Sequence, residues 1–264
     1  MRISSPTNPR IRNIVKLKDR KDRRKTGLTI VEGVREISIA RQSNLVFKEY
    51  YACPEILSRH TGEEFLQEIG KKKHPVYEIT KEVFAKISFG DRQEGIVAVV
   101  EPKPSRLNEI KSDPRGVFVI VDSVEKPGNL GAILRTCDAS GVGALLVSDM
   151  ATDIYNPNVI RASLGTVFSL PVVQAPAEEI LSFLKQKHIR IVAASPQAKR
   201  IYTKIKLDFP LAFVVGSEHE GLGDFWLKAA DGQVRIPMKG KIDSLNVSVS
   251  VAVLVYEAMR QLGD

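Results

Sequence analysis

The sequence predicts an α/β protein of two domains. Short apolar runs alternate with segments of helical periodicity along the chain. After residue 115 the apolar runs are nearly continuous, which is typical of a parallel sheet covered on both faces. A stretch rich in proline and charge, 101–114, interrupts the alternation. We therefore expect an N-terminal domain over 1–104, a linker over 105–114 and a C-terminal domain over 115–264.

The N-terminal domain is expected to be a small α/β domain that begins with a basic helix. A thin apolar stripe, which contains Ile11 and Ile14, predicts one helix over 5–25. The strand patterns that follow are 28–31, 46–52, 76–79 and 95–100. The helix patterns are 34–42, 61–69 and 81–87.

In the C-terminal domain the alternation resumes with longer helices. Strands are expected at 117–121, 144–147, 167–173, 190–194, 211–215 and 234–237. Helices are expected at 129–139, 158–164, 177–187, 223–230 and 245–261. In the first of these helices Asn129 is a good N-cap, which would place Arg135 in the second turn.

The positive charge is concentrated at the N-terminal end. Residues 1–104 hold 21 Lys+Arg against 14 Asp+Glu, a balance of +7, whereas the rest of the chain has +1 of the net +8. A basic run is often only a solvated helix face, but its concentration here favours a polyanion such as nucleic acid. The candidate RNA-binding residues are Arg10, Arg12, Lys16, Lys18, Arg20, Lys21, Arg23, Arg24 and Lys25.

Several classes of protein and site find no support in the sequence. No apolar run is long enough for a membrane span, and the N-terminus lacks the apolar core of a signal peptide. Neither Cys53 nor Cys137 has neighbours spaced like metal ligands, so we expect reduced thiols, a cytoplasmic location and no metal. No dinucleotide fingerprint or phosphate loop occurs.

Three polar loops remain, each at the carboxyl end of a predicted strand, where open α/β sheets bind their ligands. They span 126–135, 215–223 and 236–248. Taken alone, each has a plain structural explanation: a glycine-rich turn, a surface acid at Glu218, and helix N-terminal residues at Ser244 and Asn246. Three such loops at successive strand ends favour a shared binding site.

These loops resemble the signature motifs of a known enzyme family. The matching residues are Asn129 with Arg135, then Gly216-Ser217-Glu218, then Ile236-Pro237-Met238 with Ser244-Leu245-Asn246-Val247-Ser248. In order and spacing they are similar to the SpoU (TrmH-type) branch of the SPOUT RNA 2′-O-ribose methyltransferases. The region before residue 105, with Val31-Glu32-Gly33 and its basic start, resembles the ribosomal-protein-like substrate-binding domain that often precedes this catalytic domain.

The resemblance implies transfer of a methyl group from S-adenosylmethionine to a ribose 2′-hydroxyl of RNA. It also implies a C-terminal SPOUT domain with a deep trefoil knot, and an obligate homodimer. Implied catalytic residues are Arg135, Asn129, Glu218, Ser244 and Asn246. Implied cofactor-binding residues are Val215, Gly216, Ile236, Met238 and Leu245, with Ser195 as a further candidate.

The sequence leaves two questions about this chemistry open. Arginine is an awkward base because its pKa lies above about 12, so Arg135 either takes the proton of the 2′-hydroxyl or clamps a substrate phosphate. The substrate is expected to be large-subunit ribosomal RNA, with transfer RNA as the second choice. A non-catalytic RNA-binding or ribosome-assembly protein is the alternative from another class.

Overall fold

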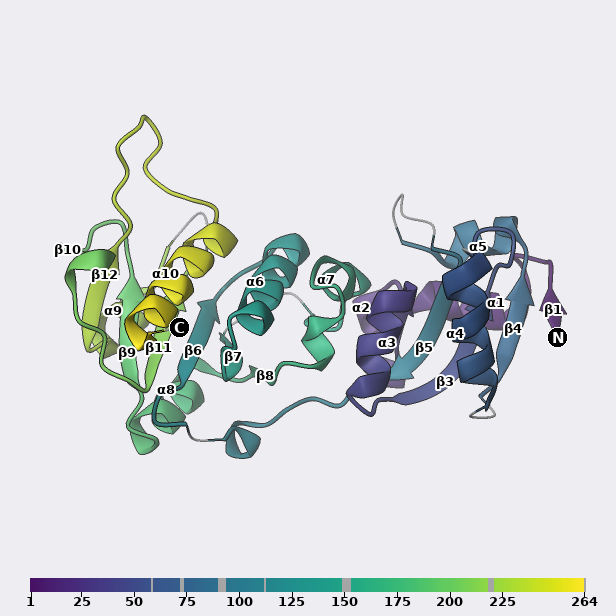
Figure 1. Ribbon diagram of the computed structural model, residues 1–264, viewed down its shortest axis with the longest axis horizontal. Helices are drawn as coiled ribbons and strands as arrows, with labels where there is room; N and C mark the ends of the chain where they lie inside the picture. The colour runs from purple at the N-terminus through teal and green to yellow at the C-terminus, as the bar shows by residue number, and fades with distance from the viewer. Residues whose placement is uncertain are drawn as a thin grey trace. The chain divides into compact units, whose positions relative to one another are not determined.

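The computed structural model describes residues 1–57, 59–71, 74–89, 94–111, 113–148, 153–217 and 221–263. The chain forms two compact units (Figure 1). Unit 1 comprises Met1–Lys103 and Asp153–Ser169, and unit 2 comprises Pro104–Thr152 and Leu170–Asp264.

In its described part, unit 1 contains a five-stranded mixed sheet in the order β1-β4-β3-β5-β2. β5 runs antiparallel to both β2 and β3, whereas β4 is parallel to β1 and β3. The strands are β1 (Arg2–Ile3), β2 (Thr29–Glu32), β3 (Val46–Ala52), β4 (Val76–Ile79) and β5 (Ile96–Glu101). Five helices come before β5 in the described chain: α1 (Pro9–Lys16), α2 (Arg20–Thr26), α3 (Val34–Gln42), α4 (Arg59–Lys71) and α5 (Lys81–Ile87).

The single helix expected over 5–25 is wrong, because the chain turns between α1 and α2. The N–H groups of Leu17, Lys18 and Asp19 each donate to the carbonyl three residues earlier, which tightens and ends α1. The guanidinium of Arg23 then donates to the carbonyls of Leu17 and Lys18 at 2.8 and 2.7 Å. Carbonyls that an α-helix would have used are satisfied by this side chain instead.

The segment Asp153–Ser169, which we expected in the C-terminal domain, packs in unit 1. It contains α7 (Pro157–Ala162), which lies against β2, and the 3-10 turn η2 (Thr166–Phe168), which lies against α3. The hydroxyl of Thr29 donates to the carbonyl of Tyr155 at 2.7 Å, and Arg23 pairs with Asp153 at 2.8 Å. These contacts join residues more than a hundred positions apart, so local sequence patterns do not predict them.

In the described residues, unit 2 has a seven-stranded sheet in the order β10-β12-β9-β11-β6-β7-β8, and every pairing is parallel. The parallel sheet expected from the apolar runs is therefore confirmed. The strands are β6 (Val117–Asp122), β7 (Ala144–Ser148), β8 (Val172–Gln174), β9 (Arg190–Ala194), β10 (Arg200–Ile201), β11 (Leu211–Val215) and β12 (Gly232–Arg235). The helices are α6 (Pro127–Ala139), α8 (Ala177–Gln186), α9 (Asp224–Ala229) and α10 (Val247–Leu262), with 3-10 turns η1 (Leu107–Glu109) and η3 (Tyr202–Lys204).

Both faces of this sheet are covered by helices. Phe118 and Ile120 pack in a core with Leu184 of α8 and Trp226 of α9. Val119 points to the opposite face, because side chains alternate along a strand, and it is also fully buried. On that face α6 and α10 pack against each other, α6 lies against β7, and α10 lies against β6 and β11 (Figure 1).

Three further expectations about unit 2 need correction. The segment 105–114 is not a free linker, because Leu107 and Ile110 pack against the unit 2 core. The strand expected over 167–173 is shortened to β8, since η2 occupies its first part. β10 was missed because two residues are too few to show an alternating pattern.

Candidate functional site

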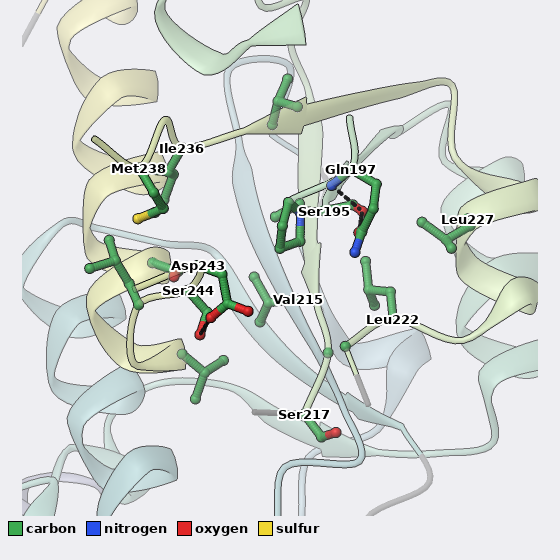
Figure 2. Close-up of a pocket in the computed structure, with 18 residues that line it drawn as sticks. Ser195, Gln197, Val215, Ser217, Leu222, Leu227, Ile236, Met238, Asp243 and Ser244 are labelled. Atoms are coloured by element: carbon green, nitrogen blue, oxygen red, sulfur yellow. Dashed lines mark hydrogen bonds between the residues drawn. The ribbon is translucent and has the colours of Figure 1, made fainter. Parts of the chain in front are cut away.

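The loops after β9, β11 and β12 enclose a cavity of about 350 Å³ in unit 2 (Figure 2). Their strands are parallel, so their carboxyl ends meet at one edge of the sheet. The segment before α10 supplies the remaining wall. The described residues that line the cavity are Ala194, Ser195, Pro196, Gln197, Val215, Gly216, Ser217, Gly221, Leu222, Leu227, Val234, Ile236, Met238, Asp243, Ser244, Leu245, Val247 and Ser250.

All six residues expected to bind the cofactor line this one cavity. They are Ser195, Val215, Gly216, Ile236, Met238 and Leu245. The sequence separates them by up to fifty positions, and the parallel strands bring them together. At this volume the cavity is within the range of small-molecule sites, about 300–1,000 Å³.

The first wall is held in place by hydrogen bonds around Ser195. Its N–H donates to the carbonyl of Val234 at 2.9 Å, which extends the pairing of β9 with β12. Its hydroxyl lies 2.7 Å from the Oε1 of Gln197, a contact drawn in Figure 2. Ser195 is itself buried, so these bonds fix the loop against the sheet.

The second wall requires glycine at position 216. A Cβ built on Gly216 would lie 1.9 Å from the carbonyl oxygen of Gly221, far inside any real contact. Ser217 and Gly221 close this loop with a bridge in which the Gly221 N–H donates to the Ser217 carbonyl at 3.1 Å. Glu218, expected among the catalytic residues, lies outside the described residues.

The third wall leads into α10 through Ser244 and Leu245. The Ser244 hydroxyl lies 3.3 Å from the Oδ1 of Asp243, and both residues line the cavity together with Val215 (Figure 2). Asn246 is the N-cap of α10: its Oδ1 accepts from the N–H of Ser248 at 3.0 Å. The structural role weighed for Asn246 is thus confirmed.

Asn246 also links α10 to α6. Its Nδ2 donates to the Oδ1 of Asn129 at 3.1 Å, across 117 positions of sequence. Contrary to our expectation, Asn129 is not the N-cap of α6. The N-cap is Lys126, and Pro127 occupies the first helical position. The structure therefore joins two of the expected catalytic residues through a direct hydrogen bond.

Arg135 lies apart from this cavity. Because α6 begins at Pro127, Arg135 is in the third turn rather than the second. Its side chain is exposed, and it forms no hydrogen bond or ion pair with the residues that the structure describes. It is not among the residues that line the cavity.

The described lining is almost uncharged, with Asp243 its one titratable side chain. Apolar groups from Ile236, Met238 and Leu245 stand beside exposed backbone and hydroxyl groups. Such a mixture suits a flat heterocycle with polar edges joined to a small cationic group. The residues present therefore fit S-adenosylmethionine.

The structure separates the nine basic residues expected to bind RNA into different environments. Arg23 is buried at 5% exposure, and its bonds to Asp153 and to backbone carbonyls make it a structural residue. This part of our expectation is wrong, because local charge patterns do not show which arginine turns inward. Lys18 donates to the Ser88 carbonyl at 2.9 Å, and burial lowers its pKa. Arg10 pairs with Glu49.

The other six basic residues have exposed side chains on α1 and α2. They are Arg12, Lys16, Arg20, Lys21, Arg24 and Lys25. An exposed row of cations on two successive helices suits the phosphates of a nucleic acid.

Comparison with known proteins identifies the family. The model of the SpoU rRNA Methylase family matches residues 116–256. The chain belongs to this family. A second model, the MRM3-like substrate binding domain, matches residues 8–98. The two matches follow each other along the chain, as the resemblance implied.

Relatives and solved structures extend over the whole chain. A 23S rRNA (adenosine(1067)-2′-O)-methyltransferase of Streptomyces azureus is 32% identical over 97% of this chain and 94% of its own length. A crystal structure of an RNA 2′-O ribose methyltransferase is 40% identical, with a TM-score of 0.88 and complete coverage of both chains. An AdoMet-bound rRNA methyltransferase from Sinorhizobium meliloti is 27% identical, with a TM-score of 0.89 over 99% of this chain and 98% of its own.

Two further observations concern the described residues alone. None of their helices combines the length and apolar character needed to cross a membrane. No group of three or more metal-ligating side chains occurs among them.

Sequence reasoning missed several residues that line the cavity. Gln197 and Leu222 come from loops that we recognised, but neither residue type distinguishes a ligand contact from a surface position. Asp243 differs from these two residues, because its acidic side chain directly before the Ser244 motif position is a signal that the sequence itself contains. Its neutral surroundings, which make it noteworthy, appear only in the fold.

Proposed function

We propose that this protein transfers a methyl group from S-adenosylmethionine to a ribose 2′-hydroxyl of large-subunit ribosomal RNA. Membership of the SpoU rRNA methylase family makes it an RNA 2′-O-methyltransferase that uses this methyl donor. The relative from Streptomyces azureus is named for an adenosine of 23S rRNA. The observation that carries the proposal is the convergence of the second and third motifs on one cavity, with the first motif joined to the third by the hydrogen bond between Asn129 and Asn246.

In this proposal the cavity holds the methyl donor through backbone and apolar groups. Val215, Gly216, Ile236 and Met238 bind the adenosine, and Leu245 packs against it, while Ser195 fixes the first wall. The bound cofactor supplies a methyl group on a cationic sulfonium, which leaves as a neutral thioether and needs no acid. The close approach of Gly216 to Gly221 keeps the backbone free of side-chain atoms at this wall.

Arg135 acts on the RNA in this scheme, as a phosphate clamp rather than a base. Its guanidinium is exposed and forms no hydrogen bond or ion pair with a described residue, so no partner holds it in the neutral form that a base requires. A guanidinium instead holds a phosphate through two parallel hydrogen bonds, which positions the adjoining ribose for in-line attack. Asn129 and Asn246 hold the start of α6 against α10, and we assign Ser244 and Glu218 to the same polar network.

A homodimer is part of the proposal. Val249 and Tyr256, one heptad apart on α10, are 46% and 51% exposed, so this helix presents apolar surface to solvent. This helix packs on α6, the helix that carries Arg135, and a second copy on this surface would complete the acceptor site with Arg135. The deep trefoil knot belongs to the proposal too, supported by the strand order β12-β9-β11 before the chain enters α10.

Unit 1 supplies the substrate-binding surface in this proposal. The MRM3-like match and the exposed cations of α1 and α2 support that role. The buried free thiols of Cys53 and Cys137 support a cytoplasmic location, where cysteines stay reduced.

The test is a methyl-transfer assay followed by mapping of the product. Full-length protein is incubated with labelled S-adenosylmethionine and either ribosomal RNA or transfer RNA, and the digested RNA is analysed by mass spectrometry. We expect a single 2′-O-methylated nucleotide in the large-subunit RNA. A ribose methyl found only in transfer RNA would show that transfer RNA, and not ribosomal RNA, is the substrate. RNA binding without methyl transfer would favour the non-catalytic RNA-binding protein. Methylation of a base would refute the assignment of the ribose 2′-hydroxyl as the acceptor.

A further inference from the structure

A second basic surface lies in unit 2, far along the chain from the basic helices. The segment 199–206 carries four cations and no acid: Lys199, Arg200, Lys204 and Lys206. All four side chains are exposed. The near-neutral balance of this half of the sequence conceals them, because acids elsewhere offset their charge.

These cations surround one hollow on the molecular surface. Lys199, Arg200, Ile201, Lys204, Ile205 and Lys206 line an open depression of about 490 Å³. None of the four cations forms an ion pair with a described residue, whereas nearby Arg190 is paired with Asp208. Unpaired cations around a depression create a local positive potential that suits a polyanion.

The segment is held firmly in position. β10 pairs with β12, with Arg200 opposite Val234 and Ile201 opposite Arg235. On the other side, the side chain of Gln261 in α10 donates to the carbonyl of Ile205 at 3.0 Å and accepts from the N–H of Leu207 at 2.9 Å. The four charges are therefore carried on a fixed edge of the sheet.

This edge adjoins the cofactor cavity. Arg200 follows Gln197 by three residues, so their Cα atoms are at most about 11 Å apart. Gln197 lines the cavity, as does Val234, the residue that Arg200 faces across β10 and β12. A nucleic acid strand bound along these cations would pass beside the cavity that we assign to the methyl donor.

We propose that Lys199, Arg200, Lys204 and Lys206 form a phosphate-binding surface for the substrate RNA on the catalytic unit itself. The surface binds the RNA backbone next to the cavity and helps to hold the acceptor nucleotide there, in addition to any contact with unit 1. This inference rests on the proposed RNA methyltransferase function and adds a second contact region to it. Phosphate contacts position a nucleic acid without reading its sequence.

Lysines on an edge strand also have a simpler use, which is to prevent pairing with other sheets. β10 is such an edge. Two features favour RNA: the four charges gather at one hollow, although only Arg200 lies on β10, and this hollow is next to the cavity. Edge protection requires neither feature.

The experiment compares two full-length variants that each lose four cations from unit 2. The test variant changes Lys199, Arg200, Lys204 and Lys206 to glutamine. The control variant changes Arg106, Lys111, Lys185 and Lys187 to glutamine. These residues are exposed and come before the amino ends of β6 and β9, away from the cavity. RNA affinity is measured for a ribosomal RNA fragment over a range of salt concentrations. S-adenosylmethionine affinity, measured by calorimetry, reports whether each variant is folded.

For the test variant we expect at least about tenfold weaker RNA binding at about 0.1 M salt. The slope of log affinity against log salt should become less steep by about 3, because each lost contact to a single-strand phosphate reduces it by about 0.7. The control variant should keep its RNA affinity within about twofold of wild type, and its slope of log affinity against log salt should be unchanged. Cofactor affinity should be unchanged in both variants. Methylation of dilute RNA should fall with RNA affinity in the test variant and recover at saturating RNA.

Three outcomes would overturn the inference. They are equal losses in both variants, an unchanged salt slope in the test variant, and unchanged RNA affinity together with self-association, which would assign the cations to edge protection. Failure of the underlying function would look different, because wild-type protein would then bind the cofactor but leave every RNA unmethylated.

Discussion

The two units carry their expected binding residues on different kinds of element. In unit 2 every strand pair is parallel, so the loops after β9, β11 and β12 meet at one edge and enclose a cavity. In unit 1 β1, β2, β3 and β4 also share one direction and β5 alone opposes them, but the basic residues expected to bind RNA lie on α1 and α2 rather than in loops at strand ends. The cofactor site that we propose is thus enclosed by converging loops, whereas the RNA-binding surface of unit 1 is an exposed row of charges on two helices. Substitutions in both units test this division.

Arg135→Ala tests whether catalysis depends on a residue outside the cavity. We expect methyl transfer to fall about 10³-fold, because a positioned cation is lost at the acceptor, while S-adenosylmethionine affinity stays within about twofold. Single-turnover rates and calorimetry measure the two quantities. Arg135→Lys keeps the charge but not the paired hydrogen bonds, so partial activity would support the phosphate clamp. Wild-type rates in Arg135→Ala would refute the assignment.

Arg23→Gln and Arg24→Gln separate the structural and RNA-binding roles of two adjacent residues. Arg23→Gln leaves Asp153 without its partner in a largely buried site, so the free energy of unfolding should fall by about 3 kcal/mol. Arg24→Gln removes an exposed charge and should change that free energy by less than about 0.5 kcal/mol while weakening RNA binding. Urea unfolding and RNA titration measure both effects. Equal stability of the two variants would contradict this division.

Gly216→Ala tests the second wall of the cavity. The added Cβ would collide with the Gly221 backbone, so we expect cofactor binding to weaken by about 2 kcal/mol, or about thirtyfold. Gly223→Ala is the matched control, because its Cβ would meet no atom within 4 Å. RNA affinity of unit 1 should be retained in both. Similar cofactor affinities for the two variants would show that the close approach has no role in binding.

Glu32 predicts a modest dependence of stability on pH. Burial raises the pKa of this carboxyl from about 4.5 to about 7, against the opposing effects of the Phe89 N–H bond and of Arg161. The folded chain then holds a proton that the unfolded chain has lost, so stability should fall as pH rises through this interval.

Urea unfolding at several pH values would detect that fall. Glu32→Gln should remove it, whereas Glu82→Gln, at an exposed position, should leave it in place. An identical pH profile for wild type and Glu32→Gln would show that another group is responsible.

The local elements of both units could be predicted well from sequence. The bounds expected for β3, β4, β9, β11, α3 and α5 agree with the structure, because the apolar pattern that marks each of them lies within the element itself. The segments that failed are short or depend on distant partners. α1 and α2 separate where the Arg23 side chain takes backbone carbonyls, and β10 exists because β12 lies beside it.

The candidate site shows the same limit. The motifs placed Val215, Gly216 and Met238 at strand ends, Ser195 was a further candidate after a strand, and their meeting on one cavity follows from a parallel sheet. The position of Arg135 relative to that cavity did not follow, because the first turn of α6 was set by Lys126 and Pro127 rather than by Asn129.

Local sequence patterns were enough to predict the alternation of strands and helices, the parallel sheet of unit 2, the family, and the motifs that supply the site. Tertiary structure alone decided that Arg23 faces inward to Asp153, that Asn246 reaches Asn129, and that Asp153–Ser169 packs in unit 1. The physical reason is distance along the chain. Periodicity and capping act within a few residues, whereas burial and pairing depend on groups that folding brings together from more than a hundred residues away.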